Sequence, residues 1–72
     1  MDILIITQNG EFIEALNIDT NLEKWAFNWL VNSGKFNDIE FWEGGKISCD
    51  LQNIVISADN GIIILDVQIK TI

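Results

Sequence analysis

Carboxylates are the side chains of this sequence that could carry out acid–base chemistry or bind a metal. Glu11 and Glu14 lie three residues apart, and Asp38 and Glu40 lie two apart. On a strand, residues at i and i+2 share a face, so Asp38 and Glu40 would approach each other there. The chain has no histidine, tyrosine or arginine, although general acid–base catalysis at neutral pH usually recruits histidine. We therefore interpret both pairs as solvent-exposed, and we expect neither an enzyme nor a metal site.

Three further motifs resemble parts of known sites but lack the residues that those sites need. Asp59-Asn60-Gly61 resembles a fragment of a calcium loop without its other ligands. Gly44-Gly45 does not precede an expected helix, as a phosphate-binding loop would. Cys49 has no histidine to activate it, and its alternating neighbours Ile47 and Leu51 indicate a buried strand residue. The sequence therefore predicts no cofactor, and the single cysteine fits a reducing compartment such as the cytoplasm.

The charge of the chain excludes some classes of partner. Eleven acidic residues face four lysines, giving a net charge of −7. Nucleic-acid binding depends on clustered lysine and arginine, and an anionic membrane surface repels an acidic protein. We therefore expect neither nucleic acid nor a membrane as a partner, and favour a protein with a basic surface.

The ends and the composition give two weaker indications. Asp2 stands where a signal peptide would be basic, and the first apolar run has only four residues, so we expect no signal peptide and no membrane span. The lack of proline and arginine, with many isoleucines and asparagines, is typical of an AT-rich genome and points to a bacterium or its phage.

Residues 20–34 carry the one strong helix signal. Thr20 and Glu23 have the spacing of a capping box, and Ser33-Gly34 is the expected end of the helix. Between these ends, five apolar residues recur with helical spacing and should face a sheet; they are Leu22, Trp25, Ala26, Trp29 and Leu30. Phe27 and Val31 lie on roughly the opposite side of this helix. They are either covered by a curled sheet or a terminus, singly exposed, or in contact with another subunit or a partner.

The remaining segments are typical of hairpins. Asn9-Gly10 predicts a type I′ turn between strands at 3–6 and 11–17, with Thr7 opposite Phe12. Residues 11–16 could also form a helix, because their apolar residues do not strictly alternate. Asn60-Gly61 predicts a second type I′ turn, which pairs Ile56 with Leu65 and places one continuously apolar face on the strands 54–58 and 62–70.

A third hairpin is predicted around Glu43-Gly44-Gly45. A three-residue loop there pairs strand 37–42 with strand 46–51, setting Phe41 opposite Ile47. The same register places Asp38 opposite Asp50, so that acidic residues cluster on the outer side of these strands.

Together the segments predict one small α+β domain over residues 1–72, with the element order ββαββββ. Its antiparallel sheet of hairpins would pack on the single helix. Both sheet faces carry apolar residues, and Ile62 and Ile64 are the clearest surplus. One helix covers one face, so the sheet either curls into a partial barrel or uses its second face to meet another chain.

Size, charge and the absence of catalytic groups favour a small non-enzymatic protein-binding module, an inhibitor of a basic nucleic-acid-binding protein such as a bacterial defence nuclease. Carboxylates along a rigid sheet would let it mimic nucleic acid, whereas a plain solubilising surface is the simpler interpretation of the same charge. The predicted binding residues combine acids with an aromatic; they are Asp38, Glu40, Trp42, Glu43 and Asp50. The alternative is a self-associating protein, a homodimer or larger, with an apolar interface of Phe27, Val31, Ile62 and Ile64.

Overall fold

The computed structural model describes residues 1–39 and 41–72, and for residues 42 and 43 it describes the backbone alone. The elements follow in the order β1 (Asp2–Gln8), β2 (Glu11–Asn17), α1 (Leu22–Asn32), α2 (Lys35–Asp38), α3 (Phe41–Gly44), β3 (Lys46–Cys49), β4 (Asn53–Ala58) and β5 (Gly61–Thr71). The five strands form one antiparallel sheet with the order β2-β1-β5-β4-β3, and the sheet does not close into a barrel. The predicted α+β class is confirmed.

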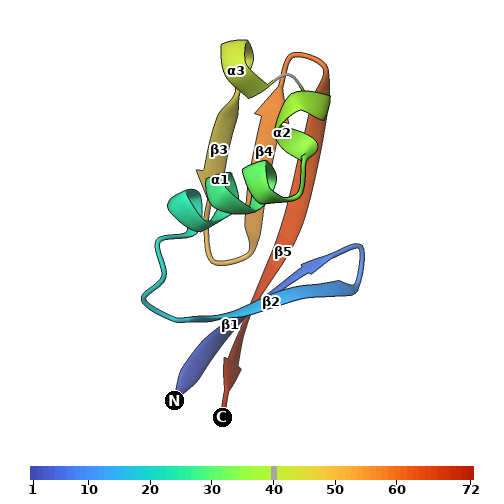
Figure 1. Cartoon of the computed structure of the whole chain (residues 1–72). Helices are drawn as coiled ribbons and strands as arrows, with labels where there is room; N and C mark the ends of the chain where they lie inside the picture. Colours follow the sequence, from blue (N-terminus) through green and yellow to red (C-terminus); the bar gives the residue numbers. More distant parts are fainter. Residues whose placement is uncertain (40) are drawn as a thin grey trace.

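The long strand β5 joins the two ends of the sheet. Figure 1 shows β3 and β4 beside its first half and the β1–β2 hairpin beside its second half, with the helices in front of the β3–β4 end. α1 packs against β3 and β4. The chain termini lie side by side, since the Ile72 N–H donates to the Met1 carbonyl at 2.7 Å. The helices all lie on one face of the sheet, which we call the inner face. The other face, the outer face, has no second layer.

The core lies between α1 and the inner face. Its buried side chains come from strand positions that alternate along β1, β4 and β5, as a half-covered sheet requires, from one position on β2 and from the helix; they are Leu4, Ile6, Leu16, Ala26, Leu30, Ile54, Ile56, Leu65 and Val67. The predicted helix stripe is confirmed, because Leu22, Trp25 and Trp29 also pack against this cluster.

The first hairpin confirms the predicted turn and corrects part of the register. Asn9 and Gly10 both have positive φ, and Thr7 pairs with Phe12 as predicted. A β-bulge then leaves Ile13 without a partner, so that every pair beyond it shifts by one residue. The bulge turns Leu16 toward the core opposite Leu4, which settles residues 11–17 as a strand.

The β4–β5 hairpin differs from the prediction by two residues. Its loop is Asp59-Asn60, and Ile56 pairs with Ile63 instead of Leu65. Contacts with the helical segment explain the shift: Asn60 Nδ2 donates to the Asp38 carbonyl, and a Cβ on Gly61 would lie 3.2 Å from Ile39 Cγ2. The glycine at 61 therefore leaves room for this close approach and is not one of the two loop residues. A shift of two preserves the faces, so the predicted apolar face is confirmed.

The predicted strand at 37–42 is wrong. The described part of this segment forms the short helices α2 and α3, and the element order is ββαααβββ in place of ββαββββ. Ile39 and Phe41 alternate like strand residues, but Phe36 and Ile39 also have helical spacing, and all three pack on the core cluster from the helical side. β3 consequently pairs with β4, and Phe41 does not lie opposite Ile47 in a ladder.

The start of α1 is also corrected by one residue. The N-cap is Asn21, whose Oδ1 accepts from the Lys24 N–H at 3.1 Å, so Thr20 and Glu23 do not form a capping box. The predicted C-terminus is confirmed: the Ser33 N–H donates to the Trp29 carbonyl, and Gly34 follows in the left-handed conformation.

Candidate binding groove

β3 is an edge strand, and every second residue directs its backbone N–H and C=O groups away from β4. The Asp50 N–H donates to the Asn53 carbonyl at 3.0 Å, so the ladder alternation makes Ser48–Val55 a hydrogen-bonded pair. Ile47 and Cys49 occupy the intervening positions. Their N–H and C=O groups are therefore directed to the open edge.

The pairing of β4 with β5 leads to the same conclusion about which backbone groups of β3 are free of β4. The Val67 N–H donates to the Gln52 carbonyl at 2.9 Å, and alternation from that bond turns the backbone groups of Ile54 toward Leu65 in β5. Ile54 is the partner of Cys49. Since Ile54 bonds to β5, the N–H and C=O of Cys49 have no partner in β4.

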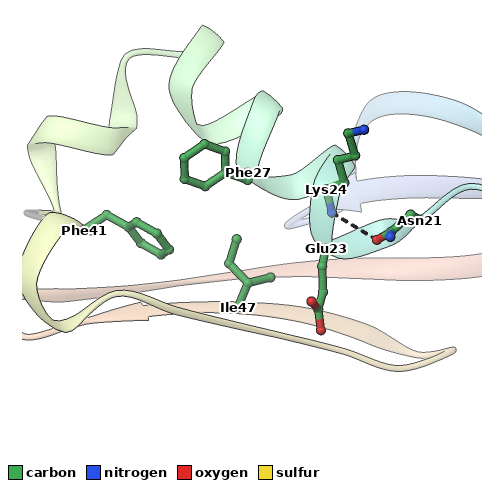
Figure 2. A pocket seen from close by; sticks show the side chains of 6 residues that line it. All are labelled: Asn21, Glu23, Lys24, Phe27, Phe41 and Ile47. Carbon is green, nitrogen blue, oxygen red and sulfur yellow. Dashed lines mark hydrogen bonds between the residues drawn. The ribbon is translucent and has the colours of Figure 1, made fainter.

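An open groove of about 460 Å³ runs between this edge and α1. Figure 2 shows the side chains that line it: Ile47 projects from β3, and Phe41 and Phe27 lie at one end. The Glu23 side chain extends from α1 toward the strands. Asn21 and Lys24 complete the rim at the start of α1, and the Lys24 side chain points the opposite way from Glu23. The groove thus combines an apolar floor and end wall with a carboxylate at its side.

The end wall consists of Phe27 of α1 and Phe41 of α3, and Phe36 of α2 packs against both rings. The ring centroids of Phe27 and Phe36 are 5.6 Å apart in an edge-to-face arrangement, and Phe41 lies 5.9 Å from Phe27 and 5.4 Å from Phe36. These are favourable separations for aromatic pairs. The cluster ties α2 and α3 to α1 and gives the groove a fixed apolar end.

Cys49, two residues after Ile47 on β3, is a weak nucleophile. Burial raises the pKa of its thiol, and the carboxylates of Glu23 and Asp50 raise it further. The neutral thiol packs against the core and is not positioned to react. Among the described residues, no group of three or more histidine, cysteine or acidic side chains could hold a metal ion.

The structure separates Asp38 from Asp50, two of the predicted acidic binding residues. Asp38 ends α2, and Asp50 follows the far end of β3, so they do not oppose each other across two strands. Glu43 and Trp42 belong to α3, with side chains outside the described set, and Glu40 lies outside the described residues.

Asp50 also has a local structural role. Its Oδ1 accepts from the backbone N–H groups of Gln52 and Asn53 at 2.7 and 2.8 Å, and these bonds lower its pKa. The carboxylate is thus ionised and fixed at the far end of β3, close to one end of the open edge.

The predicted oligomer interface divides into two parts on opposite sides of the sheet. Phe27 and Val31 lie on α1, over the inner face, whereas Ile62 and Ile64 alternate with buried Leu65 and lie on the outer face. Phe27 is moreover partly covered by Phe36 and Phe41 of the same chain. The structure thus places the four predicted interface residues on two separate surfaces.

Sequence reasoning missed the groove because it treated residues 37–42 as the neighbour of β3. With that strand in place, β3 would have no open edge, and Glu23 would be only a capping residue. The one signal that pointed here was the surplus apolar side of α1 at Phe27.

No helix in the described parts of the chain is long and apolar enough to cross a membrane. Comparisons with protein-family models, with curated proteins and with solved structures found no match for this chain.

Proposed function

We propose that this protein is a small non-enzymatic binding module, and that it takes an extended, basic and partly apolar segment of a partner protein as an added strand on β3. The observation that carries this proposal is the open edge of β3 beside an apolar groove. Added strands gain affinity from main-chain hydrogen bonds and specificity from pockets for alternate side chains.

The two edges of the sheet differ in their fitness for this role. β2 is bulged at Ile13 and carries Glu11 and Glu14, and bulges and charges are the features by which natural edge strands resist pairing. β3 is regular over its four pairs with β4 and has the groove beside it. Added pairing is therefore favoured at β3.

Charge defines the chemistry of the occupant. Glu23 overhangs the groove, Asp50 is an ionised carboxylate near one end of β3, and the whole chain carries −7. A segment that alternates lysine or arginine with aliphatic residues would place its aliphatic side chains against Ile47 and Phe41. Its basic side chains would then approach the carboxylates.

An inhibitor that occupies a segment of a basic, nucleic-acid-binding protein fits this chemistry. Mimicry of nucleic acid is less well supported, because it needs carboxylates spaced along one element. The described pair Asp38 and Asp50 belongs to different elements.

The test uses a fluorescent heptapeptide of alternating valine and lysine, titrated with the protein and followed by fluorescence anisotropy. Saturable binding that weakens as sodium chloride rises supports the proposal. Two control peptides test charge and strand addition separately. One has glutamate in place of lysine and tests the charge preference. The other is N-methylated at alternate residues, so that it cannot complete a strand ladder. Equal binding of the N-methylated peptide would contradict strand addition.

A pair of variants locates the site. Glu23→Lys reverses the charge in the groove, and we expect roughly three- to tenfold weaker binding of the lysine peptide. Glu11→Lys makes the same change of net charge at the opposite edge of the sheet and serves as the matched control. Equal losses in the two variants would show that the peptide responds to net charge alone.

A further inference from the structure

The outer face of the sheet is an apolar surface that no helix of the described chain covers. Strand alternation places seven apolar side chains on it, namely Ile3, Ile5, Phe12, Ala15, Val55, Ile62 and Ile64. Ile62 and Phe12 are each 62% exposed and Ile64 is 49% exposed. Ile64 lies directly opposite Val55, so the β4–β5 end of this face carries a contiguous aliphatic cluster.

The charge of this face differs from that of the rest of the molecule. Among the described residues, Asp66 is the only acidic residue at an outer-face strand position, and Lys46 and Lys70 occupy two further outer-face positions. These three side chains give the face a net charge of +1, within a chain whose total is −7. Acidic residues are thus almost excluded from the one uncovered apolar face.

We propose that this face binds a second copy of the chain, and that two copies pack sheet to sheet. Two molecules of net charge −7 repel each other wherever their acidic surfaces meet, and the outer face is where they can approach without that repulsion. A twofold interface uses the same patch on both subunits, so apolar side chains meet apolar side chains. A strongly basic partner would instead be drawn to the remainder of the surface.

The β2 edge of the sheet offers no comparable route to self-association. Pairing of two β2 edges would bring Glu11 and Glu14 of both copies together, next to the bulge at Ile13. Face-to-face packing of two sheets has a spacing of about 10 Å and needs no free edge. A standard interface takes about 800 Å² from each partner, which is about one sixth of the 4818 Å² surface of this chain.

This dimer leaves the groove accessible. The groove lies beside α1, on the inner side of β3, and sheet-to-sheet packing would use the opposite side. Two grooves would then face away from each other, so a partner with two suitable segments would bind with avidity. The dimer does not depend on the proposed peptide binding, and each can fail without the other.

The experiment is sedimentation equilibrium of the full chain between about 5 and 500 µM, at 0.1 and 0.5 M sodium chloride. We expect a mass of twice 8.2 kDa at the upper concentrations, and an association that is retained or strengthened in the higher salt because repulsion between the acidic surfaces is screened. A mass of 8.2 kDa throughout would overturn the proposal. An association that dissolves in high salt would do so too.

Two matched variants identify the face. Ile64→Lys on the outer face should raise the dissociation constant at least tenfold, whereas Val31→Lys, a residue of similar exposure on α1, should leave it unchanged. The reverse pattern would place the interface on the helix and overturn the proposal. If circular dichroism shows that Ile64→Lys is unfolded, Ile64→Thr takes its place, since threonine keeps the β-branch that strands favour. A dimer of Ile64→Thr as tight as the wild type would refute the proposal equally.

Discussion

Phe27 was predicted to lie in an exposed interface, but in the structure its ring packs against Phe36 and Phe41. Truncating its side chain therefore tests whether this ring cluster stabilises the fold. The side chain is 41% exposed, so about three-fifths of it is covered, and Phe36 and Phe41 do much of that covering. We expect Phe27→Ala to destabilise the fold without changing the solution mass.

The size of the effect follows from the covered fraction. Truncating a fully buried phenylalanine costs about 3–5 kcal/mol, and three-fifths of that is about 2–3 kcal/mol. Alanine recovers about 0.5 kcal/mol through its higher helix propensity, which leaves a loss of about 2 kcal/mol. A chain of 72 residues has a stability of about 4–11 kcal/mol, so the variant stays folded.

Urea unfolding followed by tryptophan fluorescence measures this loss, and thermal unfolding should show a Tm lower by about 8–16 °C. Val31→Ala is the control on the same helix, because Val31 is 46% exposed and is outside the ring cluster; we expect a loss of about 0.5 kcal/mol or less. A double-mutant cycle of Phe27 and Phe41 should give a coupling of about 0.5–1.5 kcal/mol. If Phe27→Ala costs no more than Val31→Ala, the rings do not hold α3 in place.

Three further predictions concern single residues. The N–H groups of Gln52 and Asn53 lower the pKa of Asp50. The stabilisation by Asp50 is therefore present above the pKa of the unfolded chain and is lost as the pH falls through the pKa of the folded protein, so the difference in urea midpoint between wild type and Asp50→Ala should shrink between about pH 5 and pH 2. A constant difference would contradict the role of Asp50 in the turn. The pKa of Cys49 is raised, so its thiol should react with iodoacetamide at pH 7.5 more slowly than free cysteine and faster in Glu23→Gln, as mass spectrometry can follow. Gly34 has φ of 79° with no atom near its missing Cβ, so Gly34→Ala should cost about 1–2 kcal/mol in urea unfolding through backbone strain alone.

The parts of the fold that the sequence predicted are those governed by local rules. The helix stripe, its glycine end and the Asn9-Gly10 turn follow from periodicity and from the need for positive φ. The faces of β4 and β5 were also predictable, because a register error of two residues leaves every side chain on its face.

The parts that the sequence did not predict depend on tertiary contacts. Ile39 fits a strand together with Phe41 and a helix together with Phe36, and Phe41 packs against Phe27 from the helix α3. The pairing of β1 with β5 joins the two ends of the chain, and no local signal encodes it. The groove depends on both, since β3 is an edge only when residues 37–42 are not a strand.

Amide hydrogen exchange at β3, measured by NMR with and without the valine–lysine heptapeptide, tests whether the peptide adds to this strand. We expect the N–H groups of Ile47 and Cys49 to exchange fast in the free protein and to become protected when the peptide binds. The N–H of Ser48, which already bonds to β4, should be protected in both states. Peptide binding that leaves Ile47 and Cys49 unprotected, or that protects the β2 edge instead, would contradict strand addition at the groove.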